Sequence, residues 1–396
     1  MSDPIKNGYV NWIDGMKISR GHFLELQQAA EARFRDTRAI LTQAMDFGVV
    51  PGGAHGKASL DYVLTIEGRS KFNLRLSQCR AITPSGDRIE VLDAPDQYDQ
   101  QLVLASEIPQ AMVLEGAEFD VIVRADPDNM EPYGVPNPQE SPPRHPFARP
   151  RCTLEWVPVK DMRHDGFGRH HLAIARMRIV KDELVHDQEF MPACMSMDAL
   201  PRLEEFHREY FKFLKEMERH LFRIAIRLNK RETTTELSDS VGAFCLAAIG
   251  FLERDLGLLQ VHGASLPPRR LVLHAVGFAR TLLYAIELLT GKGKDGLLDY
   301  VREVIALPPA EYMATITGLT DLDYDHTDLK SALGRIQVFC RTQKKLLDEW
   351  VGLDYIGAKK DKNIFIEQET PVTRQAPPRS APVKPPPPEE KGGWNF

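Results

Sequence analysis

Hydrophobic and polar positions alternate in short runs through the first half of the chain, which is the pattern of half-buried strands. The clearest runs are "YVLTI" (62–66), "FNLRL" (72–76), "RIEVL" (88–92), "FDVIV" (119–123), "CTLEWVPV" (152–159) and "HLAIARMRIV" (171–180). Turn-forming residues separate them, as in "PSGD" at 84–87. Strands at this spacing, with few long helices between them, predict a β-sandwich.

Two segments interrupt this pattern. Residues 22–46 are rich in Ala, Gln, Glu and Arg, and their apolar residues recur near helical spacing, so they predict one early helix. Residues 126–150 are rich in proline, which removes backbone donors, and they predict a long loop without regular structure. A loop of that length inside a compact domain is often functional.

At Leu200 the apolar positions change to steps of three and four, which predicts a helix of about 30 residues with one apolar stripe. A last helix begins near Thr327, where the steps alternate as in a heptad seam with one polar position, Gln343. The periodicity fits packing inside one chain as well as packing between copies. We expect a neck that joins copies, through Leu203, Phe206, Tyr210, Leu214, Met217, Leu221, Ile224 and Leu228 and through Leu329, Leu333, Ile336, Cys340, Leu347 and Trp350.

The chain after Trp350 has no period and no apolar face. Residues 368–396 are rich in proline, which predicts a disordered tail with polyproline II character. Its aromatic residues Trp394 and Phe396 are candidates for docking on a partner, and the alternative is a terminus without a role. The sequence thus predicts an α+β chain with a β-sandwich at 1–198, a helical bundle at 199–355 and a flexible tail at 356–396.

Composition narrows the class of protein. Of the 396 residues, 43% are hydrophobic and 27% charged, and the net charge of −6 gives no basic footprint for nucleic acid. The five cysteines are scattered without a CxxC pair, as expected of reduced thiols in the cytoplasm. The apolar runs fall short of the roughly 20 residues that a membrane helix needs. We therefore expect a cytoplasmic protein.

No catalytic constellation is visible in the sequence. His164, His170 and His171 suggest a metal hydrolase as an alternative, but neighbouring strand residues point to opposite faces and no carboxylate or cysteine lies at ligand spacing. The acidic residues at 321–328 lack the order of a calcium loop, and we expect Asp325 or Thr327 to cap the last helix. We predict no enzyme activity, no metal and no cofactor.

Two motifs carry a family resemblance. Residues 11–23, "NWIDGMKISRGHF", resemble the W-x-E-G-M-x-L-x-P-Q-H-F signature of TssK, the trimeric baseplate subunit of bacterial type VI secretion systems. Arg20-Gly21 replaces the Pro-Gln of that signature. Residues 322–336, "LDYDHTDLKSALGRI", are similar to the Tyr-x-His-x-Asp-Leu entry into a late helix of the family. The resemblance covers about residues 5–355 of the chain.

The resemblance implies a non-enzymatic homotrimer with a shoulder like that of phage receptor-binding proteins, a helical neck and a head, which the Pro-rich tail replaces here. It implies that the shoulder binds wedge proteins resembling TssF and TssG, at the cytoplasmic face of the inner membrane. The tail is then the candidate contact for membrane-complex proteins. A phage tail baseplate or receptor-binding adaptor is the alternative.

The first motif has two possible roles. It either anchors the early helix on the sandwich or grips the wedge, with Gly15 allowing a tight turn and Asp14 hydrogen-bonded to His22. Its candidate residues are Trp12, Asp14, Gly15, Met16, Ile18, His22 and Phe23.

Overall fold

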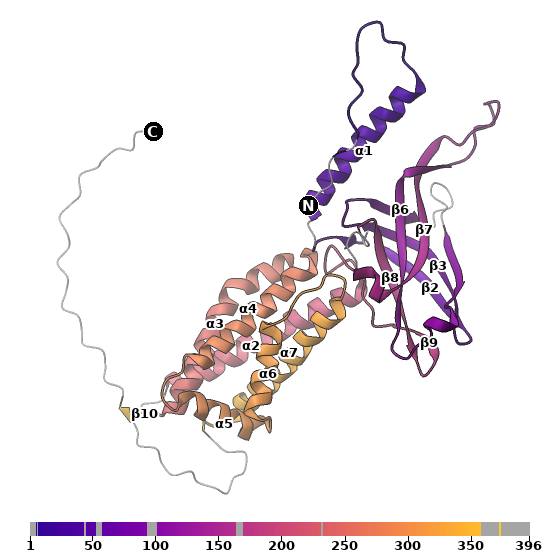
Figure 1. Cartoon of the computed structure of the whole chain (residues 1–396). Helices are drawn as coiled ribbons and strands as arrows, with labels where there is room; N and C mark the ends of the chain where they lie inside the picture. Colours follow the sequence, from indigo (N-terminus) through magenta and orange to yellow (C-terminus); the bar gives the residue numbers. More distant parts are fainter. Residues whose placement is uncertain are drawn as a thin grey trace, which may run out of the picture.

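The computed structural model describes residues 5, 7–42, 45–52, 58–92, 101–163, 169–230, 233–357 and 372–373. A β-rich part precedes a helical part, and one helix projects from the body (Figure 1). The β-rich part comprises α1 Arg20–Thr42, β1 Gly48–Val49, β2 Leu60–Glu67, β3 Lys71–Ile82, β4 Arg88–Leu92, β5 Leu102–Glu107, β6 Glu118–Tyr133, β7 Phe147–Pro158, β8 His171–Val180 and β9 Glu183–His186, with short 3₁₀ turns at Gln110–Met112 and Val159–Arg163. The helical part comprises α2 Pro201–Asn229, α3 Glu236–His262, a 3₁₀ turn at Gly263–Ser265, α4 Pro268–Glu287, α5 Gly293–Ile305, α6 Pro309–Thr320 and α7 Leu329–Gly352, and the two-residue strands β10 Thr233–Thr234 and β11 Val372–Thr373 pair with each other.

Two antiparallel sheets form the β-rich part. In one, the long strand β3 pairs with β5 and β4 on one edge and with β2 and β1 on the other, and the second sheet has the order β7-β6-β8-β9. Phe72, Leu74 and Leu76 of β3 are buried while the residues between them are exposed, as the alternating pattern predicts. The Trp156 Nε1–H donates to Ser106 Oγ at 2.9 Å and links the two sheets.

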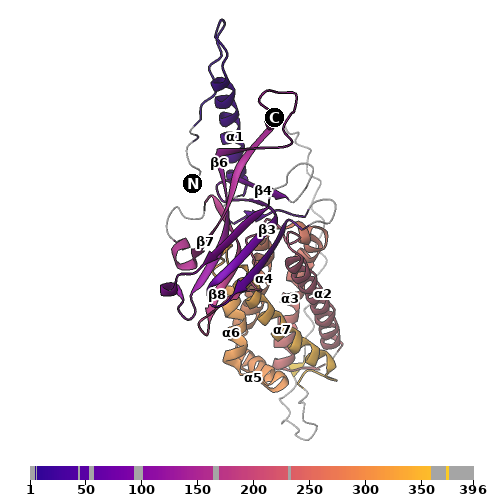
Figure 2. The ribbon, with the colours of Figure 1, turned by 90° about the vertical axis from the view of Figure 1, so that its right-hand side faces the viewer.

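The prediction of an irregular loop at 126–150 is wrong for both of its ends. β6 and β7 stay paired out to Tyr133 and Phe147, which makes a long β-arm (Figure 2). The ladder tolerates proline for two reasons. A register shift between Asp126 and Met130 leaves Pro127 out of the pairing with β7, and β8 pairs with β6 only as far as Arg124, so the arm has two free edges.

The predicted neck residues lie inside the bundle of a single chain, which corrects the expectation that they join copies. On α2 the whole stripe is buried except the half-buried Phe206, and on α7 only Cys340 is incompletely buried. Gln343, the polar position of the seam, is fully buried and its Oε1 accepts from the Tyr312 hydroxyl of α6 at 3.1 Å. Helices of the same chain cover both stripes, because α2 packs on α3 and α7, and α7 also packs on α6.

Within the described ranges, the helices are too short or too polar for any of them to traverse a lipid bilayer.

Replacing a buried neck residue should destabilise the single chain. We expect Leu214→Ala, at a fully buried position, to lower the free energy of unfolding by about 2–5 kcal/mol because it leaves a cavity. Phe222→Ala, whose parent side chain is 47% exposed on the same helix, should cost less than about 1 kcal/mol. Urea unfolding at two protein concentrations measures both. If Leu214→Ala lowered the free energy of unfolding only at the lower protein concentration, this side chain would instead lie in a contact between copies.

Candidate interaction surface on the N-terminal helix

The helix α1 stands away from the body together with the segment that precedes it. Both views show the loop between the two at the far end of the helix (Figures 1 and 2). The Arg33 guanidinium lies 3.6 Å from the centre of the Tyr9 ring and donates to the Asn7 carbonyl at 3.2 Å. Residues 7–19 and α1 therefore form one antiparallel arm, with its tip remote from the sheets.

The first sequence motif forms this tip. Gly15 has a φ of +75°, as predicted, and Met16 N–H closes the turn by donating to the Ile13 carbonyl at 3.2 Å. His22 Nδ1 accepts from the Ser19 backbone N–H at 3.2 Å at the start of the helix, and the Trp12 ring meets the His22 ring edge-on, with centroids 6.0 Å apart. His22 thus pairs with Ser19, where the sequence predicts Asp14.

The motif buries little of itself against its own chain. Trp12 is 46% exposed and Phe23 is 58% exposed, although tryptophan and phenylalanine that anchor a fold are usually buried. Of the seven candidate residues, Trp12, Asp14, Gly15, Ile18 and Phe23 are exposed, and Met16 and His22 are half-buried. This arrangement favours the contact-surface alternative over the internal anchor.

The exposed apolar surface continues down the helix beyond the motif. Among the side chains of α1 that the structure describes, only Ala29 and Ala32 are buried, whereas Phe34 is 62% exposed. The sequence shows the helical spacing of these apolar residues but not that they face outward, because the same spacing also fits a helix packed on a sheet. We call the following residues the apolar arm surface: Tyr9, Trp12, Ile13, Ile18, Phe23, Leu24, Leu26, Phe34, Ile40 and Leu41.

The turn between β3 and β4 fastens the other end of α1. Gly86 has a φ of +82° and touches the helix backbone, since a Cβ at this position would lie 2.1 Å from the Arg35 carbonyl oxygen. Arg38 Nε donates to the Gly86 carbonyl at 2.7 Å, and the buried Asp87 carboxylate lies 3.5 Å from the Arg35 guanidinium. Burial alone would raise the pKa of Asp87, but hydrogen bonds from His170 and Ser85 and the charge of Arg35 bring it below its usual value. The carboxylate is therefore ionised at neutral pH and holds the helix.

This cluster does not have the geometry of a catalytic triad. Asp87 Oδ2 and Ser85 Oγ lie 2.7 and 3.0 Å from the same His170 nitrogen, Nδ1, whereas a triad uses both ring nitrogens. His171 is buried, and burial followed by the charges of Arg124 and His170 lowers its pKa to about 4. His164 lies outside the described residues. Within the described ranges no three His, Cys, Asp or Glu side chains are grouped to hold a metal ion, so the metal-hydrolase alternative gains no support there.

The second motif connects the base of the arm to the helical part. His326 is buried at the entry to α7, where its Nε2 lies 2.8 Å from the Phe47 carbonyl oxygen and its Nδ1 lies 2.7 Å from the Tyr324 hydroxyl. Because a carbonyl only accepts, Nε2 carries the proton and Nδ1 accepts from Tyr324. Phe47 also packs edge-on against the His326 ring at 4.9 Å. We call these three residues the His326 junction.

Charged residues surround this junction. Asp46 pairs with Arg269 at 2.5 Å, which ties the segment after α1 to the start of α4. Lys330 of α7 lies 3.3 Å from Asp187, just beyond β9. The N-cap of α7 is Asp328, which accepts from the Ser331 N–H, so the prediction of Asp325 or Thr327 is wrong. Asp325 instead accepts from Thr327 in the preceding turn.

The His326 junction predicts a specific pH dependence. Burial lowers the pKa of His326 below its ordinary value of about 6.5. The neutral side chain therefore stabilises the fold when the pH is above about 6.5, and this stabilisation is lost as the pH falls below that value. We expect His326→Phe to cost about 1–3 kcal/mol at neutral pH, because it leaves the buried Phe47 carbonyl unpaired, and to flatten the decline of stability between about pH 7 and pH 5. Chemical unfolding across this range measures the effect, with the exposed His262→Phe as control. A parent-like slope in His326→Phe would contradict the assignment.

Comparisons with known proteins identify the fold. No family model matches the chain, and neither does any curated protein. A crystal structure of TssK is similar over 85% of this chain and 69% of that chain, with a TM-score of 0.50 and 15% identity. A chain of the baseplate complex from the type VI secretion system is similar over 85% of this chain and 99% of that chain, again with a TM-score of 0.50 and 15% identity. The chain therefore has the fold of TssK, as its two motifs predict.

Proposed function

We propose that this chain is a structural component of a type VI secretion baseplate that binds its neighbours through the apolar arm surface. The observation that carries the proposal is the position of the motif at residues 12–23, which ends a projecting arm with Trp12 and Phe23 exposed. The TssK fold supports it, since a chain of similar fold is part of a solved type VI baseplate complex. The proposed role is structural, without enzyme activity.

The proposed partners of the arm are wedge proteins resembling TssF and TssG. Large exposed apolar patches on soluble proteins mark contact sites, and aromatic side chains contribute most to the binding energy of such contacts. The ten residues of the apolar arm surface lie on both the tip and the helix. A partner that covers both the tip and the helix would bury apolar side chains along the whole arm, as specific interfaces do.

Three copies of the chain are proposed to associate through a surface other than the predicted neck stripes. The neighbouring helices α3 and α4, together with the residue directly after α4, expose several large apolar side chains: Leu258, Val261, Leu273, Tyr284 and Leu288. We call this set the α3–α4 outer face. Burying this face around a threefold axis would stabilise the trimer by about 25 cal/mol for each Å² of apolar area removed from water.

Each part of the chain has a separate proposed role. We propose that residues 1–198 act as a shoulder related to phage receptor-binding proteins, that 199–355 act as the neck, and that the trimer links the wedge to the anchoring side at the cytoplasmic face of the inner membrane. Trp394 and Phe396, the predicted docking residues for membrane-complex proteins, lie outside the described residues.

Truncating the aromatic residues of the tip should weaken wedge binding without unfolding the chain. We expect Trp12→Ala or Phe23→Ala to weaken binding to the purified wedge about 30-fold, the effect of losing roughly 2 kcal/mol at a hot spot. Phe222→Ala is the matched control, because Phe222 is 47% exposed, as Trp12 is 46% exposed, but lies on α2.

Binding is measured by interferometry and folding by thermal melting of the same samples. Tip variants that melt as the parent does and still bind the wedge fully would refute the proposed contact. Variants that melt early would instead support the internal anchor.

A further inference from the structure

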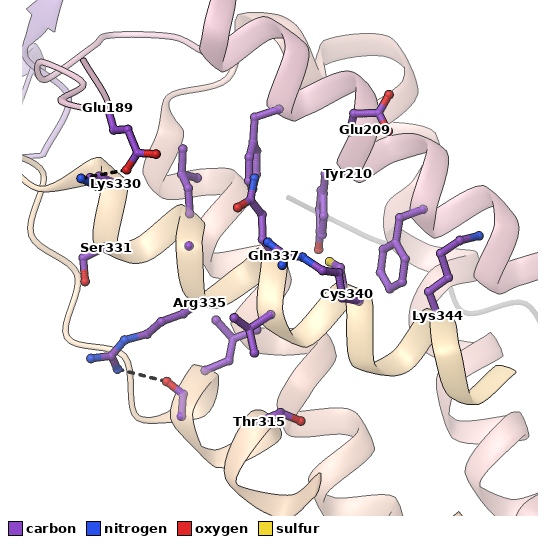
Figure 3. A pocket seen from close by; sticks show the side chains of 18 of the residues that line it. Glu189, Glu209, Tyr210, Thr315, Lys330, Ser331, Arg335, Gln337, Cys340 and Lys344 are labelled. Atoms are coloured by element: carbon purple, nitrogen blue, oxygen red, sulfur yellow. Dashed lines mark hydrogen bonds and ion pairs between the residues drawn. The ribbon is translucent and has the colours of Figure 1, made fainter. Parts of the chain in front are cut away.

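A groove of about 970 Å³ lies between α2 and α7 and reaches α6 at one side (Figure 3). The α2 wall carries Phe206, Tyr210 and Phe213, and the α7 wall includes Gly334 and Val338. This groove explains why Phe206 is the one residue of the predicted α2 stripe that is not fully buried.

The α2 wall is a row of aromatic rings. Phe206 and Tyr210 stack with centroids 6.5 Å apart, and Tyr210 and Phe213 stack at 6.3 Å. The α7 wall leaves space opposite them, since nothing lies within 4 Å of where a Cβ on Gly334 would be and Val338 is 49% exposed. An aromatic wall that faces an open wall with the exposed Val338 at its centre is the kind of groove that binds proline-rich or aromatic peptides.

The two walls differ in charge. Glu205 and Glu209 lie along α2, whereas Arg341 lies on α7, and all three side chains are exposed. None of the three has an ion pair among the residues that the structure describes. A ligand with both signs of charge would therefore find partners on both walls.

We propose that this groove binds residues 384–396 of the same chain, "KPPPPEEKGGWNF". The four prolines and the two aromatic residues of this segment suit the aromatic wall and the open space beside Gly334 and Val338. Its two glutamates complement Arg341, and its two lysines complement Glu205 and Glu209. The proposal goes beyond the baseplate role and does not depend on the arm.

The chain is long enough to reach. Thr373 pairs with Thr233, directly after α2, so this point of the tail lies beside the distal end of that helix. From Asn229 back to Tyr210 the helix spans about 29 Å at 1.5 Å per residue. The twelve residues from Thr373 to Pro385 span about 37 Å as polyproline II, so the proline run reaches the groove without strain.

Occupancy of the groove would have a consequence for the tail. Trp394 and Phe396 would be sequestered on the neck, and a partner that recognises them would have to displace them first. The same contact would withdraw the exposed parts of Phe206 and Val338 from water.

Photo-crosslinking in the full chain tests the proposal, with a benzophenone side chain in place of Asn395 and peptide mapping of the products. We expect crosslinks within one copy, to residues 203–213 of α2 and 333–341 of α7. Crosslinks to other parts of the chain, or only between copies, would overturn it. Because this experiment leaves the arm unchanged, its outcome is separate from that of the wedge-binding test.

Two matched exposed valines provide the control. We expect Val338→Lys to reduce groove crosslinks about tenfold, because an ammonium group loses hydration in an apolar groove, and Val63→Lys on β2 to leave them unchanged. Val338→Ser gives the same comparison with a smaller change, and thermal melting verifies that each variant folds. Equal crosslinking in the parent and both Val338 variants, or an equal loss in Val63→Lys, would contradict the assignment.

Discussion

One hydrogen bond, from His326 Nε2–H to the Phe47 carbonyl, connects the parts of the molecule on which the proposed function depends. It joins the entry of α7 to the segment between α1 and β1, and the Asp46–Arg269 ion pair beside it joins the same segment to α4. The base of α1 is held on its other side by Asp87 and Gly86. The direction of the arm therefore depends on these polar contacts, of which His326 and Asp87 are buried, and removing one partner of a buried pair destabilises the fold.

Among the residues that the structure describes, the chain covers its core by itself but leaves apolar side chains exposed, including those of two proposed contact surfaces. Gln343 shows the first point, because Tyr312 of the same chain donates to Oε1 of this residue, the polar position that could have specified association between copies. The apolar arm surface and the α3–α4 outer face show the second. Groups of exposed apolar side chains on one chain are typical of a subunit in a larger assembly.

The sequence predicts the helices and strands better than it predicts which of their faces are covered, and by what. The alternating strands and the long helices α2 and α7 are predicted correctly, because period and burial coincide in each of them. The early helix is predicted from its helical spacing alone, since its apolar residues are mostly exposed. Periodicity cannot say which molecule covers a stripe, so Leu214 and Ile336 were assigned to contacts between copies, although both are buried by their own chain. The sequence does not predict the β-arm, because proline at the free edge of a strand destabilises the pairing little. It does not predict that Phe34 faces outward, because burial depends on tertiary packing.

The arm at residues 7–42 is central to this picture, since its aromatic side chains must remain accessible until a partner covers them. Hydroxyl-radical footprinting of the isolated full chain measures this accessibility residue by residue. Trp12, Phe23 and Phe34 should be oxidised rapidly, while the fully buried Phe339 and Trp350 stay protected. If Trp12 and Phe23 were as protected as Trp350 in the isolated chain, the arm would be packed on its own protein and the proposed contact surface would not exist.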